Sequence, residues 1–172
     1  MGPKAPALLV VLVETERRRW FVAAVDLDGT ATPLLRSESG DLDRYLSLDF
    51  DEQVAFLRHR ICGILQRGCD RLWGRHRKAC QFVLVFESPL PPDGELTRAV
   101  AEHFALWMLN PPVAVLVAAD GFDGPGPVRL DAVGGDLDAS LGRLVRDRLG
   151  DLLGARRDPD AWEVARRNDA WC

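Results

Sequence analysis

The stretch Trp20-Phe-Val-Ala-Ala-Val-Asp-Leu-Asp-Gly-Thr-Ala-Thr-Pro-Leu-Leu35 places Asp28-Gly29 between two apolar runs. Asp-Gly in this setting is a strong hairpin signal, because a type I′ turn needs positive φ at both central positions. A two-residue turn here predicts that Val25 pairs with Thr32 across an antiparallel ladder. The second strand contains a proline, which cannot donate to a ladder, so residues 30–37 are predicted to be an edge strand.

The segments around this hairpin predict an α/β fold. Continuous apolar runs rich in β-branched residues predict buried strands over residues 7–13, 81–86 and 113–118. Apolar stripes at helical spacing predict helices over residues 49–75, 95–109 and 136–153. The order strand, strand, strand, helix, strand, helix, strand, helix predicts a five-stranded mixed sheet. In that sheet an antiparallel three-strand meander is followed by two parallel strands, with helices on both faces.

This order of elements resembles the ribonuclease H-like fold over about residues 7–153. The resemblance is one of topology and rests on no diagnostic motif. Nucleases of that superfamily hold two divalent metal ions with several carboxylates, the first in the middle of the first strand and another after the fourth. Here Glu14 ends the first strand, Glu87 follows the fourth and Asp120 follows the fifth, whereas the first strand has no acid at its middle. A divergent metal-dependent nuclease using Glu14 and Glu87 is therefore one alternative function.

A second resemblance lies in Val25-Asp-Leu-Asp-Gly-Thr30, which is similar to the first motif of haloacid dehalogenase-like phosphohydrolases. The resemblance implies that Asp26 attacks phosphorus, that Asp28 is the acid and base, and that Mg²⁺ offsets the phosphate charge. Asp120 would then belong to the acidic fourth motif. The family also uses a downstream cation, usually lysine, and this chain has no lysine after Lys78. The match is therefore also typical of an ordinary Asp-Gly turn.

Length and composition predict one domain over residues 1–157, followed by a tail over residues 158–172 that forms a short helix. The chain has 172 residues, 47% of them hydrophobic, and a net charge of -4. Its four cysteines and three histidines show no zinc-binding spacing, so no metal or other cofactor is expected unless an enzyme alternative holds. The longest early apolar run is too short for a membrane span, which predicts a cytoplasmic protein without membrane contact.

Charge and aromatic residues provide the candidates for binding. Residues 58–78 hold seven lysines and arginines and one acid, which makes nucleic acid a conceivable partner. Trp20, Trp162 and Trp171 are predicted as interface anchors, since aromatic side chains dominate contact energetics. The leading hypothesis is a non-catalytic binding or assembly module that acts through protein contacts, with a protein partner or a second copy of the chain.

Overall fold

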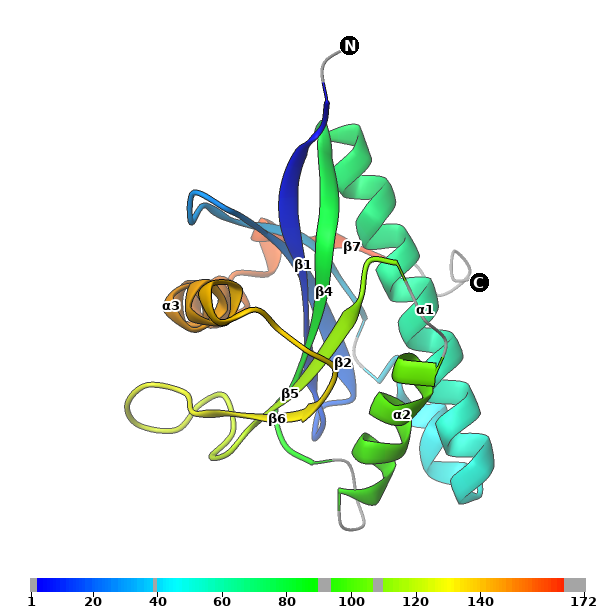
Figure 1. Cartoon of the computed structure of the whole chain (residues 1–172). Helices are drawn as coiled ribbons and strands as arrows, with labels where there is room; N and C mark the ends of the chain where they lie inside the picture. Colours follow the sequence, from blue (N-terminus) through cyan, green and yellow to red (C-terminus); the bar gives the residue numbers. More distant parts are fainter. Residues whose placement is uncertain (1–2, 39, 90–93, 107–109, 166–172) are drawn as a thin grey trace.

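A mixed sheet forms the centre of the molecule (Figure 1). The computed structural model describes residues 3–38, 40–89, 94–106 and 110–165. Within these ranges the sheet has seven strands in the order β6-β5-β4-β1-β2-β3-β7. The strands are β1 (Ala5–Glu14), β2 (Arg19–Asp26), β3 (Ala31–Arg36), β4 (Arg77–Phe86), β5 (Val113–Ala118), β6 (Leu130–Gly134) and β7 (Glu163–Val164). The helices are α1 (Phe50–Gly74), α2 (Glu95–Leu106) and α3 (Ala139–Ala155), with 3₁₀ turns η1 (Asp43–Ser47) and η2 (Pro159–Ala161).

The predicted hairpin is present, but its register differs from the prediction. Strands β2 and β3 are antiparallel, and Val25 pairs with Ala31 rather than with Thr32. The backbone carbonyl of Asp26 accepts a hydrogen bond from the Gly29 N–H at 2.9 Å, and Gly29 has φ +94°. A type I turn followed by a left-handed glycine makes a three-residue loop, which shifts the pairing by one position. A bulge between Val22 and Ala23 restores the predicted register further along the ladder.

The sheet contains two strands that were not predicted. Strands β4 and β5 run parallel to β1, as the sequence indicated, whereas β6 adds an antiparallel strand beside β5. At the other edge, β7 pairs in parallel with the end of β3. The expectation of five strands is therefore wrong, since the described residues form seven. The two additional strands are short: β6 has five residues and β7 has two. Segments this short carry too little periodicity to be recognised from the sequence alone.

Helices cover both faces of the sheet, with α1 and α2 on one side and α3 on the other (Figure 1). Side chains of β1 alternate between the two cores: Leu9 and Val11 join the core under α1 and α2, whereas Leu8 and Val10 join the core under α3. Among the described residues, no helix combines the length and apolar character needed to cross a bilayer.

The segment after α3 differs from the predicted helical tail. Residues 159–164 form a 3₁₀ turn and the strand β7, and residues 166–172 lie outside the described part of the chain. Trp162 belongs to the core under α3, where its ring centroid lies 5.1 Å from that of Phe21. Its Nε1 donates to the carbonyl of Ala155 at 2.8 Å. The core therefore includes a residue beyond the predicted domain end at residue 157.

Candidate functional site

The two acids predicted for the nuclease alternative meet at one end of the sheet. Glu14 is the last residue of β1, and Glu87 directly follows β4. Because β1 and β4 are parallel and Val13 pairs with Phe86, the two carboxylates emerge side by side. This carboxyl-terminal edge of the parallel strands is the lower end of the sheet in Figure 1. Ligands of open α/β sheets bind preferentially at such an edge.

A buried arginine lies between these acids. Arg156 Nη1 donates to Glu14 Oε2 at 2.7 Å and lies 4.0 Å from Glu87 Oε2. Its Nη2 donates to Asp123 Oδ1 at 2.6 Å. The side chain of Arg156 is only 4% exposed and that of Glu14 only 1%, and Glu14 also accepts a hydrogen bond from Arg19. The carboxylates therefore surround a guanidinium group, which compensates their charge.

The surroundings shift the pKa values of Glu87 and Asp123 in opposite directions. Burial raises the pKa of Glu87, and the nearby charge of Glu14 raises it further, while Arg156 opposes the shift. Burial acts to raise the pKa of Asp123, but Arg156 and Arg157 lower it on balance. The surroundings thus disfavour ionisation of Glu87 and favour ionisation of Asp123. Beside it, the hydroxyl groups of Thr15 and Ser88 share a hydrogen bond.

An open hollow of about 550 Å³ lies next to this cluster. We call it the arginine hollow; its lining residues are Arg17, Arg19, Asp123, Arg156, Arg157 and Pro159. Four arginines and one aspartate thus line it, and two of these arginines, Arg19 and Arg156, are already paired with the buried Glu14. Arg157 donates to Asp123 at 3.3 Å and is 73% exposed. The chemistry of this surface favours the binding of an anionic group, because guanidinium donors match the geometry of carboxylates and phosphates.

Sequence reasoning missed Arg156 and Arg157, although one signal was present. The apolar stripe of α3 contains Val145, Leu149 and Leu152, and the next step of four residues reaches Arg156. An arginine at an inward-facing position must find a charged partner when it is buried. The identity of that partner, Glu14, depends on tertiary structure and leaves no trace in the local pattern.

The acids predicted for the phosphohydrolase alternative lie at two opposite ends of the sheet. Asp26 pairs with Ala7 near the start of β1. The exposed Asp120 instead follows the end of β5. Near that end, Val117 of β5 pairs with Phe86 of β4, and Phe86 pairs with Val13 near the end of β1. Six residues of strand separate Ala7 from Val13, which corresponds to about 20 Å at the usual rise per residue. The motif therefore does not converge on one site.

The motif residues themselves have structural partners. Asp26 forms an ion pair with Arg77 at 3.0 Å. Asp28 accepts a hydrogen bond from the Thr30 N–H at 2.9 Å, and this bond lowers the pKa of its carboxyl group. The bond of Asp28 is typical of a stabilised turn, in which an aspartate side chain binds the backbone two residues on. The ion pair of Asp26 links β2 to the start of β4.

Two of the three predicted partner anchors are not on the surface. Trp20 and Trp162 are both buried, and Trp20 Nε1 donates to Asp41 at 2.8 Å. Their prediction as interface anchors is wrong, because apolar residues of the neighbouring elements cover both indole rings. Trp171 lies outside the described residues. Among the tryptophans that the structure describes, Trp73 is the exposed one, and the Lys4 ammonium lies over its ring at 3.3 Å from the centroid.

The basic stretch of α1 and β4 is partly neutralised. Arg60 pairs with Asp41, Arg71 with Glu163 and Arg77 with Asp26. These pairs join the helix and the following strand to neighbouring elements and reduce the charge available to a nucleic acid. The predicted edge strand over residues 30–37 is also partly covered, since Leu35 and Arg36 of β3 pair with β7.

Within the described ranges, no group of three or more histidine, cysteine, aspartate or glutamate side chains is arranged to hold a metal ion. Comparison of the chain with protein family models, curated proteins and solved structures finds no match.

Proposed function

We propose that this chain is a non-catalytic binding module that acts through protein contacts, and that its contact region is the carboxyl-terminal edge of the sheet. The observation that carries the proposal is the position of Arg156 between Glu14, Glu87 and Asp123. An acid cluster that serves metal-dependent hydrolysis presents its oxygens to cations and substrate. Here oxygens of Glu14 and Asp123 accept hydrogen bonds from arginine, and Glu87 lies 4.0 Å from the same guanidinium group. The surface beside them presents the guanidinium groups of Arg17 and Arg157.

The proposal includes a ribonuclease H-like core. It is supported by the order β5-β4-β1-β2-β3, in which β1 lies between β2 and the parallel strand β4. In this interpretation β6 and β7 are additions at the two edges. The fold does not define an activity, so the chemistry of the edge decides between binding and catalysis.

Activity assays test the non-catalytic part of the proposal. The purified chain is incubated with an aryl phosphate, and separately with single-stranded and double-stranded nucleic acid, in the presence of Mg²⁺ or Mn²⁺. Turnover should equal that of buffer for the wild type, Glu87→Gln and Asp26→Asn. Metal-dependent turnover that disappears in Glu87→Gln would support the nuclease alternative, and turnover that disappears in Asp26→Asn would support the phosphohydrolase alternative.

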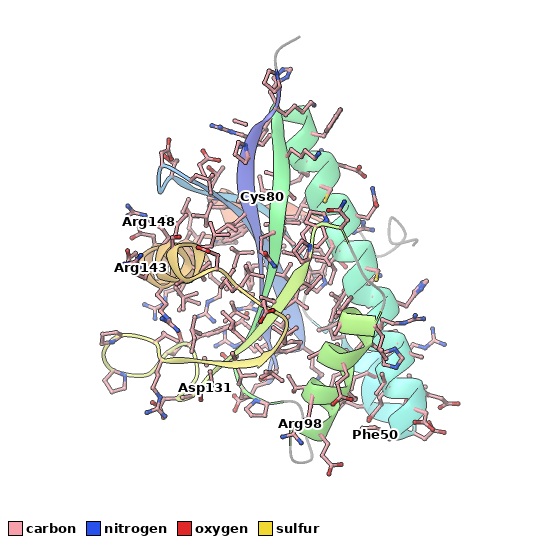
Figure 2. All side chains as sticks on the ribbon, in the orientation of Figure 1. Phe50, Cys80, Arg98, Asp131, Arg143 and Arg148 are labelled. Atoms are coloured by element: carbon pink, nitrogen blue, oxygen red, sulfur yellow. The ribbon has the colours of Figure 1, made fainter. Side chains whose placement is uncertain are left out.

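Crosslinking in cells tests the binding part. A photoreactive amino acid replaces Arg17, which lines the arginine hollow, or Arg98, which is exposed on α2. Figure 2 shows Arg98 and Phe50 on the opposite side of the sheet from Arg143 and Arg148 of α3. We expect position 17 to form one discrete protein adduct that excess wild-type chain competes away, and position 98 to form none. Equal adduct patterns at the two positions would contradict the proposal.

A further inference from the structure

We propose, building on the function inferred above, that the partner inserts an extended segment in which a large apolar side chain stands next to acidic side chains. Two adjoining hollows on the α3 side of the molecule carry this inference. One is the arginine hollow. The other, which we call the α3 groove, lies between α3 and the connection from β5 to β6 and has a volume of about 550 Å³.

The α3 groove has an apolar lining. Its apolar side chains are Phe122, Pro127, Val128, Leu149 and Leu153. Gly150 and Gly154 of α3 also line it, and a Cβ atom at either glycine would meet nothing within 4 Å. The helix backbone is therefore open to close approach by another chain at these two positions. An apolar concave surface with a few polar groups at its rim is typical of a ligand-binding site.

The groove leads into the arginine hollow. Arg157 lines both depressions, and Asp123 of the arginine hollow directly follows Phe122 of the groove. A bound segment can thus bury an apolar side chain against α3 while its neighbours reach the guanidinium groups. Charge selects acidic neighbours, because the exposed guanidinium groups of Arg17 and Arg157 lie on this surface.

The arginines differ in their capacity for a further ligand. Arg19 and Arg156 are engaged with the buried Glu14, and Arg156 also faces Glu87. Among the described residues Arg17 has no hydrogen bond or ion pair, and Arg157 makes only one side-chain contact, with Asp123. These two exposed guanidinium groups are the ones that an acidic segment would contact. On the groove rim Arg146 and Asp147 carry opposite charges and give no net preference.

The length of the groove favours a peptide over a small ion. Its lining extends along α3 from Arg146 and ends at Arg157, two residues beyond the last residue of the helix. At the helical rise per residue this distance is about 16 Å, which corresponds to about five residues of extended chain. A lone phosphate or carboxylate would fill only a small part of this space and would leave the apolar floor unused.

Selection from a random peptide library tests the chemistry of the segment. The library is displayed on phage and selected on the full-length chain. We expect enriched peptides to place a large apolar residue within about five positions of two or more acidic residues, which is the span that the groove accommodates. Enrichment of peptides without acidic residues, or no enrichment at all, would overturn the inference.

Variants then locate the binding site. Affinity of one enriched, fluorescently labelled peptide is measured by anisotropy for Arg17→Glu, Arg157→Ala and Gly150→Leu, with Arg98→Glu as the matched control. Each of the first three should weaken binding about tenfold or more, since a few residues carry most of the energy of an interface. Arg98→Glu should bind like the wild type. Gly150→Leu blocks the groove from a helix position with open space, and Arg17→Glu alters an exposed turn, so thermal unfolding should report a folded protein for both.

The combined results separate the two proposals. Peptide binding that is unaffected by Arg17→Glu and Gly150→Leu would overturn the inferred site. If the protein adduct at position 17 still forms in that case, the proposed function stands and only the chemistry of the segment is wrong. Loss of both peptide selection and the adduct would contradict the proposed function as well.

Discussion

The guanidinium group of Arg156 lies 2.7 Å from the carboxylate of Glu14, and 142 positions separate the two residues in the chain. The contact joins the residue that follows α3 to the last residue of β1. Both side chains are buried, so neither charge can be compensated by water if the other is removed. This pair therefore fixes α3 to the sheet and also sets the charge of the proposed contact region.

Replacement of Glu14 by glutamine should destabilise the protein strongly. The amide keeps the shape of the side chain but leaves Arg156 and Arg19 without the negative charge that both contact. Breaking a buried ion pair on one side costs about 3 kcal/mol of unfolding free energy. Urea denaturation followed by circular dichroism measures the change. A loss below about 1 kcal/mol, typical of an exposed pair, would contradict the importance of this contact.

Replacement of Glu87 by glutamine should not destabilise the protein at neutral pH, in contrast to the replacement of Glu14. Because the folded state raises the pKa of Glu87, the native protein binds more protons at this group than the unfolded chain does. Stability attributable to Glu87 is therefore present below the ordinary glutamate pKa and is lost as the pH rises through the raised value. Glu87→Gln removes this dependence.

We expect Glu87→Gln to be at least as stable as the wild type at pH 7, and the difference to disappear in acid. Denaturation curves at a series of pH values check the prediction, with Glu14→Gln measured in parallel. A Glu87→Gln variant that is destabilised as strongly as Glu14→Gln would show that the ion pair with Arg156 outweighs burial of the carboxylate.

Close packing of α1 against the sheet should make Gly68 intolerant of alanine. A Cβ atom at Gly68 would lie 2.6 Å from Leu9 Cδ2 and 3.0 Å from Val22 Cγ1. Forced shifts in a packed core cost about 1 to 3 kcal/mol. Gly150→Ala is the matched control, since its Cβ meets nothing and alanine favours the helix by up to about 1 kcal/mol. Thermal unfolding should therefore move in opposite directions for the two variants.

Local patterns in the sequence predicted much of the fold but little of the site. Asp28-Gly29 located the hairpin, and Asp49 marked the start of α1, where the structure contains a capping box with Glu52. The hairpin register could not be predicted, because a three-residue loop and a two-residue loop share the same signal. The burial of Trp162 and the ion pair of Arg156 depend on contacts with distant β-strands, and no periodic pattern encodes them.

The turn of the β2–β3 hairpin should be sensitive to Gly29→Ala. Gly29 has φ +94°, a conformation that side chains rarely adopt, and an added Cβ would lie 2.8 Å from Arg148 Nη2. Backbone strain of this kind costs about 1 to 3 kcal/mol. Leu27→Ala in the same loop is the control, because the Leu27 side chain is exposed and should change stability by less than about 0.5 kcal/mol. Equal effects of the two variants on the melting temperature would contradict this account.

Trp162 should stabilise the domain rather than bind a partner. Its side chain is 4% exposed and packs edge-on against Phe21, so Trp162→Ala leaves a cavity beside α3 and removes the hydrogen bond to the Ala155 carbonyl. Removal of a large buried aromatic side chain costs about 3 to 5 kcal/mol. Trp73→Ala is the matched control, because that ring is 61% exposed and loses mainly its contact with Lys4, worth about 0.5 to 1 kcal/mol. Chemical denaturation of both variants distinguishes a core residue from a surface residue. If Trp162→Ala kept the wild-type midpoint while losing the crosslinked adduct at position 17, Trp162 would contribute to the interface and not to the core.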